Sequence, residues 1–378
     1  MSVFLFHIGM IFNNWDWHIK NNVTAGHRSA LWYIMVFLHT WRMPLLILIS
    51  GAGTYFALGR RTSWQYLKER FTRLFIPLAI GIFTLVPVQV YIEKQEQYGS
   101  LPAYYPHMFD GIYPSGNFSW HHLWFIAYLF FIALIISPFL GFFRSGRFDL
   151  FVDRLAGIVT KRFGANVFVL PLLVSQVTLR PFFPDNTHAL VNDWAAVSYF
   201  LLFFLSGFII ISNPRFTESI RRQKWLFLAE ALITSTLLVT VPSMIPGKAG
   251  GVLWDLLEPV VAFSCGLAAL GFARQYLTRN NKLRKLANEA IYPFYLLHQP
   301  VIVVTGSYIV EWPLGVAWKA ILITLLSFAL TVAFYWYVVR PFNVMRVVFG
   351  MKPRTRQRKA TARKVEPVWA VEGIKRTG

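Results

Sequence analysis

The sequence predicts an all-α protein, a polytopic integral membrane bundle of about ten transmembrane helices with both termini cytoplasmic. Three observations predict this class. Of the 378 residues, 56% are hydrophobic, and the mean hydropathy of the chain is +0.47. Only 14% of the residues are charged, whereas soluble domains contain about 25%. Apolar runs close to the roughly 20 residues that a helix needs to cross a bilayer recur along most of the chain.

Polar segments separate the apolar runs and so place the expected spans. The spans cover residues 1–15, 30–58, 73–92, 122–143, 165–180, 194–212, 225–242, 252–273, 290–310 and 317–340. The first is short because the chain begins inside it, and we expect a preceding segment to complete this helix. The fifth is short and contains Pro171, which leaves its limits open.

Basic residues alternate between two sets of connecting segments. The segments after the second, fourth, sixth and eighth spans contain clusters, namely Arg60, Arg61, Lys68, Arg70 and Arg73; Arg144, Arg147, Arg154, Lys161 and Arg162; Arg215, Arg221, Arg222 and Lys224; and Arg274, Arg279, Lys282, Arg284 and Lys285. The other loops contain few basic residues. Because cytoplasmic loops are enriched in Lys and Arg, this pattern places both termini in the cytoplasm.

The same pattern divides the chain into two parts. Residues 1–345 form the expected transmembrane domain. Residues 346–378 form a basic cytoplasmic tail that we expect to be disordered and to contact lipid headgroups. The net charge of +20 therefore reflects topology and membrane lipids as partners, and we do not expect nucleic acid to bind.

The sequence lacks the signatures of several common sites. Cys265 is the only cysteine, which excludes an intrachain disulfide. The chain has no Gly-rich phosphate loop ending in Lys-Ser/Thr, no His-Glu-x-x-His motif and no Gly-x-Ser-x-Gly elbow. His121 and His122 are adjacent, but no further ligands occur at a workable spacing. We therefore expect no metal and no bound cofactor.

Two basic side chains lie deep in the first two expected spans. His7 precedes the interface-like segment that starts at Trp15, so it lies about 12 Å deeper at 1.5 Å per residue. Arg42 lies roughly 18 Å into the second span, and both depths are near the midplane of a core with a half-thickness of about 15 Å. Because a buried arginine costs about 2.5–3.5 kcal/mol, such residues are kept for chemistry or transport. His7 can take a proton from a hydroxyl, and Arg42 can stabilise an oxyanion.

Other polar residues of the spans lie at neighbouring depths and could meet this pair in one cavity. His39 lies one helical turn before Arg42, and His298 lies in the ninth span. Glu258 lies in the eighth span, where it could pair with Arg42. His298 could instead be a packed, hydrogen-bonded group, and His39 could bond a helix carbonyl.

Both ends of the bundle contain further candidates. Arg70 and Arg73 are three residues apart, so they share one helix face at the cytoplasmic mouth of the third span. This pair suits phosphate groups, although an ordinary positive-inside cluster has the same composition. At the outer end, an aromatic loop could stack on sugar rings or only anchor the interface. The candidates beside that loop are His18, His122 and Trp124.

Small residues interrupt two of the expected spans in the same way. The two steps are Ile49-Ser50-Gly51 and Leu205-Ser206-Gly207. Because small residues allow two helix backbones to approach, these steps predict close helix packing.

Several short motifs follow one another in a specific order between residue 4 and about residue 300. They are Phe6-His7-Ile8, Trp17-His18-Ile19-Lys20-Asn21, Arg42-Met43-Pro44 with Ile49-Ser50-Gly51, Arg70 and Arg73 with Ile76-Pro77, His122-Leu123-Trp124-Phe125, and Tyr295-Leu296-Leu297-His298. Together they resemble the acyltransferase 3 superfamily of polytopic membrane O-acyltransferases, and within it most of all the glucans biosynthesis protein C group. One feature departs from the family, because the arginine that usually lies several turns before the histidine would precede Met1.

The resemblance implies an enzyme that transfers acyl groups other than amino-acyl groups, from cytosolic acyl-CoA as co-substrate. It implies His7 as the catalytic residue, and Arg70 and Arg73 as donor-binding residues. We therefore predict an O-acyltransferase of the acetyl or succinyl class, which acts on a hydroxyl of an extracytoplasmic carbohydrate or glucan in the inner membrane of a bacterium. A transporter or flippase for a polar or lipid-linked solute is the alternative, since buried charges also line transport paths. A non-catalytic scaffold explains the topology but not Arg42 and His7.

Overall fold

The computed structural model describes residues 2–59, 61–184, 187–278 and 281–354, and its regular elements in these ranges are helices. The α-helices are α1 (Ser2–Phe12), α2 (Ala30–Leu58), α3 (Ser63–Arg70), α4 (Ile76–Glu93), α5 (Gln95–Tyr98), α6 (Leu101–Tyr104), α7 (Trp124–Ile136), α8 (Gly146–Val159), α9 (Val169–Leu179), α10 (Trp194–Ser212), α11 (Pro214–Arg222), α12 (Lys224–Thr240), α13 (Lys248–Tyr276), α14 (Lys282–Ile309), α15 (Val316–Phe334) and α16 (Asn343–Val348). Two π-helices, η1 (Phe71–Phe75) and η8 (Tyr335–Val339), extend α3 and α15. The remaining short elements are 3-10 helices: η2 (Tyr105–His107), η3 (His121–Leu123), η4 (Ser137–Leu140), η5 (Phe142–Arg144), η6 (Gly164–Phe168) and η7 (Pro242–Met244).

The all-α, polytopic membrane fold predicted from the sequence is confirmed. Within the described ranges, seven helices are long and apolar enough to cross a membrane, and a helix occupies each of the ten predicted positions. Two of the other three, α1 and the segment Gly164–Leu179, are apolar but shorter. The third, α14, is 28 residues long, but polar residues such as His298 and Gln299 lower its mean hydropathy. Of these two residues, Gln299 lines the cavity described below, and His298 stacks on His7 beside it.

The third span begins earlier than predicted. A single helical segment runs from Ser63 to Glu93, with the π-helix η1 between α3 and α4. Its start is fixed by a capping box, in which Thr62 accepts a hydrogen bond from the backbone of Gln65 and the Gln65 side chain accepts one from the backbone of Thr62. Hydropathy did not predict this start, because the charged residues of α3 give the segment a low mean hydropathy.

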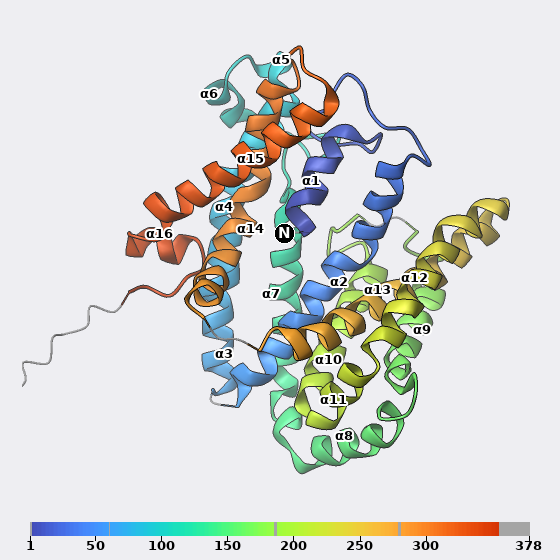
Figure 1. The fold of residues 1–378 in the computed structure, drawn as a ribbon. Coiled ribbons are helices and arrows are strands. Elements are labelled where there is room, and N and C mark those ends of the chain that lie inside the picture. The colour runs from blue at the N-terminus through green and yellow to red at the C-terminus, as the bar shows by residue number, and fades with distance from the viewer. Residues whose placement is uncertain (1, 60, 185–186, 279–280, 355–378) are drawn as a thin grey trace, which may run out of the picture.

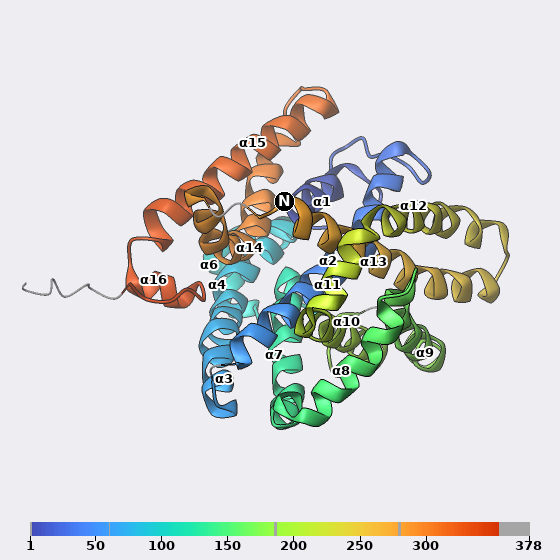
Figure 2. The same cartoon turned by 60° about the horizontal axis from the view of Figure 1, so that its bottom comes forward.

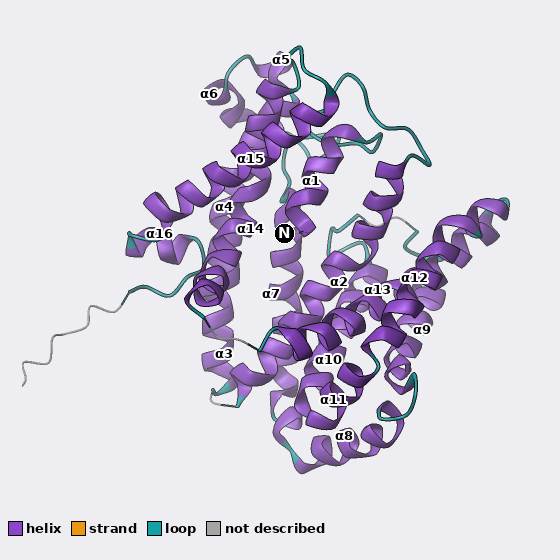
Figure 3. Cartoon of the chain, viewed as in Figure 1, coloured by secondary structure: helices purple, strands orange, loops and turns teal. Residues whose placement is uncertain are grey.

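The helices form one bundle with two distinct ends. Helices α3, α8 and α11, which contain predicted cytoplasmic clusters, lie at one end, and α5 and α6 lie at the other (Figure 1). We call these the basic end and the loop end. In a second view, α15 and α16 lie on one flank and α12 on the opposite flank (Figure 2). Helices account for most of the chain, with loops confined to the connections (Figure 3). The orientation in a membrane stays a prediction from the charge pattern.

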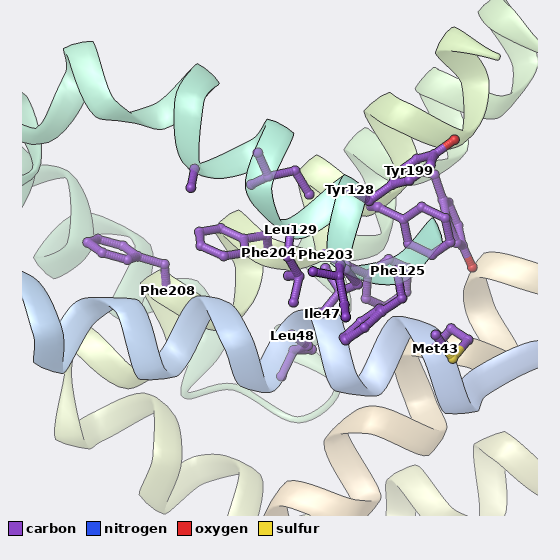
Figure 4. Close-up of a cluster of buried hydrophobic side chains, with 14 of the residues drawn as sticks. Met43, Ile47, Leu48, Phe125, Tyr128, Leu129, Tyr199, Phe203, Phe204 and Phe208 are labelled. Atoms are coloured by element: carbon purple, nitrogen blue, oxygen red, sulfur yellow. The ribbon is translucent and has the colours of Figure 1, made fainter. Parts of the chain in front are cut away.

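The centre of the bundle is an apolar core where α2, α7 and α10 meet. Large side chains such as Ile47 and Phe203 are fully buried there (Figure 4). The close packing predicted from the small-residue steps is confirmed. A Cβ atom on Gly51 would lie 1.9 Å from the carbonyl oxygen of Phe204, and one on Gly207 would lie 1.9 Å from that of Leu48. Glycine is therefore required at both positions for α2 and α10 to touch.

The first part of the predicted tail packs against the bundle. Arg346 forms an ion pair with Glu289 at 2.9 Å and donates a hydrogen bond to the carbonyl of Lys352 at 2.8 Å. Gly350 has a positive φ of 67° and accepts a hydrogen bond from Arg73. Residues 355–378, for which the sequence predicts disorder, lie outside the described residues.

Candidate functional site

A cavity of about 380 Å³ lies between α1, α2, α7 and α14, toward the loop end. We call it the histidine cavity. It brings together five residues that the sequence singled out, although they come from four different segments. These residues are His7, His18, Arg42, His122 and Trp124.

His7 lies at the centre of a group of imidazoles. Its ring stacks on that of His298 from α14, with ring centroids 5.0 Å apart and an interplanar angle of 20°. The ring of His298 in turn meets the edge of His122 at 5.6 Å. The Nδ1 atom of His7 is buried, with no hydrogen-bond partner among the described residues. A ring nitrogen without a structural partner is free for chemistry.

A proline in α14 explains how His122 is held. Pro300 has no backbone N–H, so the carbonyl of Leu296, four residues earlier, has no partner within the helix. The Nε2 atom of His122 lies 3.1 Å from that carbonyl and donates to it. His298 donates from Nδ1 to the carbonyl of Tyr295 at 2.5 Å. Each ring therefore keeps one nitrogen with a lone pair, Nδ1 in His122 and Nε2 in His298, and both are buried and unpartnered within the described chain.

Arg42 is held by an aromatic ring rather than by an acid. Its guanidinium lies 3.3 Å from the centroid of Phe6, an arrangement in which the ring face attracts the cation. Its Nε and Nη1 atoms are buried without a hydrogen-bond partner in the described ranges. The suggested pairing of Arg42 with Glu258 does not occur among the described ion pairs, because the cation instead packs on Phe6. Two donor nitrogens of Arg42 thus remain available in the site.

A smaller chamber of about 70 Å³ adjoins the histidine cavity and shares Arg42, Met43, Trp124 and His188 with it. This side chamber contains two more of the sequence candidates, His39 and Glu258. His39 packs between the rings of Phe6 and Trp15, with centroid distances of 5.7 and 5.6 Å. Its hydrogen bond to a helix carbonyl, considered from the sequence, is not among the described bonds.

His188 and Arg180 complete the side chamber, and the sequence had not singled them out as site residues. His188 stacks on Trp124, with ring centroids 4.0 Å apart. Burial, with Arg42 and Arg180 nearby, lowers the pKa of His188 to about 3. Its imidazole is therefore neutral at pH 7. Arg180 lies 3.6 Å from Asp193, the buried N-cap of α10. His188 lies in a polar loop, and no sequence pattern distinguishes it from a solvent-exposed histidine.

His18 is held by Glu93 and Gln299, which sequence reasoning missed, and Tyr113 in turn holds Glu93. Its Nδ1 atom lies 2.6 Å from a carboxylate oxygen of Glu93, at the end of α4. Tyr113 also donates to Glu93, and Gln299 lies 3.3 Å from the Nε2 atom of His18. Gln299 directly follows His298, so its place on the site helix was a signal in the sequence. Tyr113 belongs to the aromatic loop for which stacking on sugar rings was considered, but its contact with Glu93 was not expected. Glu93 had no signal, since it is a single acid at the end of a span.

A second, larger cavity of about 1070 Å³ opens toward the basic end. We call it the arginine cavity. It contains Arg70 and Arg73, as the sequence suggested, together with Arg61, Arg144 and Lys352. Arg144 donates to the carbonyls of Leu58 and Arg61, which fixes it at the end of α2. Arg61 belongs to the same basic cluster of the sequence as Arg70 and Arg73, whereas Arg144 and Lys352 come from distant segments that the sequence could not group with them.

Arg70 and Arg73 differ in how they are held. Arg70 lies 5.0 Å from the centroid of Tyr66, and its Nε atom is buried without a described partner. Arg73 donates to the carbonyl of Gly350 at 3.2 Å and pairs with Glu69 at 3.2 Å. Glu69 also pairs with Arg61 at 3.0 Å. The shared helix face expected from a spacing of three is altered by the π-helix η1, which widens the turn. Both side chains nevertheless reach one cavity, which suits a polyanionic ligand.

No group of three or more His, Cys, Asp or Glu residues in the described ranges has an arrangement that could hold a metal ion. The histidines of the site instead contact one another through their rings, as His7 does with His298 and His298 with His122. The chemistry that this arrangement allows is therefore proton transfer and nucleophilic attack by imidazole, next to a fixed cation.

Comparison with known proteins points to one enzyme family. A family model described as an acyltransferase domain matches residues 1–340. The chain is similar to proteins named glucans biosynthesis protein C from Salmonella agona and Salmonella paratyphi A, with 23% identity over 344 residues in each case. A third, from Salmonella enteritidis PT4, has the same identity, and these matches cover 80% of this chain and 79% of the relative. No solved structure matches the chain.

Proposed function

The chain belongs to the acyltransferase 3 family, and we propose that it is a membrane O-acyltransferase that moves an acyl group from acyl-CoA to a carbohydrate hydroxyl. The family match makes it a transferase of groups other than amino-acyl groups, and its helices make it a multi-pass membrane protein. The donor would be an acetyl-class or succinyl-class CoA thioester from the cytosol. The acceptor would be an extracytoplasmic glucan, as the names of the relatives suggest, and the location a bacterial inner membrane.

The observation that supports this proposal most is the shared cavity of His7 and Arg42. The two residues come from α1 and α2 and have unpartnered nitrogens in one cavity. The Arg42 donors can stabilise a developing oxyanion, because they are fixed in place and have no other partner among the described residues. Arg42 would bind the carbonyl oxygen of the acyl group, while His7 would act on the acceptor hydroxyl directly or carry the acyl group itself. Arg70 and Arg73 would bind the phosphates of the donor in the arginine cavity.

The direct test uses the purified full chain in lipid nanodiscs with radiolabelled acetyl-CoA and succinyl-CoA. We expect release of CoA and labelling of glucose oligomers by the wild type, and loss of both in His7→Ala. Thermal stability of the variant must match that of the wild type. His27, an exposed histidine that packs on Trp32, provides the control, and His27→Ala should retain full activity. Solute transport without thioester consumption would contradict the proposal.

A further inference from the structure

A chain of side-chain hydrogen bonds includes two residues that line the histidine cavity, His18 and Gln299. Gln89 donates from Nε2 to the backbone carbonyl of Leu85 at 3.0 Å. Gln299 donates from Nε2 to the Oε1 atom of Gln89 at 2.9 Å. The same nitrogen of Gln299 lies 3.3 Å from the Nε2 atom of His18. The chain ends at Glu93, 2.6 Å from the Nδ1 atom of His18.

The direction of each bond in this chain follows from its first member. The carbonyl of Leu85 can only accept, so it fixes the amide nitrogen of Gln89 and turns the Gln89 oxygen toward Gln299. Gln299 must then present its NH₂ group, which has donors only, to His18. The Nε2 atom of His18 therefore accepts and has a lone pair. The proton of His18 is on Nδ1, where it is donated to Glu93.

The carboxylate of Glu93 is itself held in place. Tyr113 donates to both of its oxygens, at 3.1 and 3.3 Å. Burial is the largest cause that raises the pKa of Tyr113, and the charge of Glu93 is the second. The phenol therefore stays protonated and donates its hydrogen to Glu93. A carboxylate that accepts from Nδ1 of a histidine fixes the tautomer and the ring orientation of a general base. His18 has this arrangement, with its lone pair on the nitrogen opposite to Glu93.

The molecule contains a second histidine–carboxylate pair that serves as a comparison. His107 and Asp110 lie 2.7 Å apart through the same Nδ1 atom, but their side chains are 51% and 60% exposed. The side chain of His18 is only 4% exposed, and His18 lines the same cavity as His7. The distance to a carboxylate therefore does not distinguish His18 from His107. His18 differs because it is buried, lines the same cavity as His7 and has a fixed tautomer.

We propose that His18 is the base that takes the proton of the acceptor hydroxyl, that Glu93 positions it, and that His7 carries the acyl group. This inference rests on the proposed function. Gln299 now donates to the lone pair of His18 over a long 3.3 Å contact, and an acceptor O–H would replace that donor.

The reaction then has two steps that balance. In the first, a ring nitrogen of His7 attacks the thioester carbon, a C–N bond forms, the C–S bond breaks, and CoA leaves as a thiolate. In the second, the hydroxyl oxygen attacks the acyl carbon, a C–O bond forms, and the C–N bond breaks with its electron pair returning to His7. The hydroxyl proton moves to Nε2 of His18, which later releases it to water.

Burst kinetics test these separate roles of His7 and His18. The natural acceptor need not be known, because water can serve as the acceptor. The full chain in nanodiscs is mixed rapidly with acetyl-CoA, and released thiol is followed per enzyme. We expect the wild type to release one equivalent quickly and then to turn over slowly. His18→Ala and His18→Gln should keep the burst, while the slow phase falls by about 10²- to 10⁴-fold. Free imidazole should partly restore turnover in His18→Ala.

The positioning residue and the control variant sharpen the result. Glu93→Gln should keep the burst and lower the slow phase, and Glu93→Asp should recover part of the rate. His107→Ala removes the exposed pair and should behave as the wild type. The inference is overturned if either His18 variant keeps the wild-type slow phase, if the burst and the slow phase fall together, or if the wild type shows no burst. A wild type that consumes no acetyl-CoA or succinyl-CoA contradicts the proposed function instead.

Discussion

The histidine cavity and the arginine cavity differ in the kind of charge that they contain. The first, of about 380 Å³, has several imidazoles with unpartnered nitrogens and one arginine packed on Phe6. The second, of about 1070 Å³, has permanent cations, two of which are already paired with Glu69. The lone pair of a neutral imidazole can accept a proton or attack a carbonyl carbon, whereas a guanidinium group stays protonated. The comparison indicates that chemistry belongs to the first cavity and the binding of a polyanion to the second.

Helix α2 connects the two cavities and also separates them. Arg42 lines the histidine cavity, and Ser50 is the first α2 residue of the arginine cavity. At about 1.5 Å per residue, the two positions are roughly 12 Å apart along the helix. The side chains between them, such as Ile47 and Leu48, are fully buried in the apolar core (Figure 4). A donor bound in the arginine cavity must pass its thioester through or around this packed layer to reach His7.

The largest expected effect is that a substitution in the histidine cavity lowers kcat, whereas one in the arginine cavity raises the KM for acyl-CoA. Arg42→Gln removes donors aimed at the reacting carbonyl, so we expect kcat to fall by about 10²- to 10³-fold with little change in the KM for acyl-CoA. Arg73→Gln removes a charged contact to a phosphate group and should raise that KM by roughly tenfold to a hundredfold, with kcat maintained. Initial rates of thiol release over a range of acyl-CoA concentrations measure both constants.

An exposed arginine at the basic end gives the control for both variants. Arg222 pairs with Glu218, and its side chain is 73% exposed. Arg222→Gln should leave both kinetic constants at their wild-type values. If Arg42→Gln raises KM as strongly as Arg73→Gln does, the two cavities do not have separate roles.

A second effect concerns the packed layer itself. Gly51→Ala places a methyl group against the carbonyl of Phe204, so α2 and α10 must move apart. Overpacking of this kind costs about 1–3 kcal/mol, and thermal unfolding in detergent should show a lower midpoint. The shift should be accompanied by loss of activity, because α2 positions both Arg42 and the end of the arginine cavity.

Gly53 is the matched control for this stability measurement. It lies two residues further along the same helix, and a Cβ atom there would meet nothing within 4 Å. Gly53→Ala should be neutral or stabilise the helix by about 0.5–1 kcal/mol, since alanine loses less backbone entropy. Equal destabilisation by the two changes would show that the contact of α2 with α10 is not the cause.

Hydropathy and charge patterning were sufficient to predict the helices and the two deep residues. His7 and Arg42 are costly in an apolar run, so their depth alone marked them, and they line one cavity. Glu93 could not be found in this way, because its contact with His18 spans 75 residues of sequence. The suggested pairing of Arg42 with Glu258 was wrong for a related reason. Opposite charges suggest a partner, but the ring face of Phe6 competes for the cation, and only the fold decides which lies closer.

The smallest expected effect tests whether Glu69 weakens the binding of an anionic donor in the arginine cavity. Glu69 pairs with Arg61 and Arg73 and reduces their attraction for an anionic donor. Such partly exposed pairs are worth about 0.2–1 kcal/mol each. Glu69→Gln should therefore lower the KM for acyl-CoA by at most about fivefold, with kcat unchanged and the effect smaller at high salt.

The control for this change is an acid that pairs with arginines outside the cavity. Glu218 forms ion pairs with Arg221 and Arg222 on α11, and Glu218→Gln should leave the KM unaltered. A KM that rises in Glu69→Gln would mean that Glu69 holds Arg73 in its binding position more than it neutralises it. Glu69 would then position an arginine in the arginine cavity, as Glu93 positions His18 in the histidine cavity. The two cavities would differ only in the charge of the side chains that the acids hold.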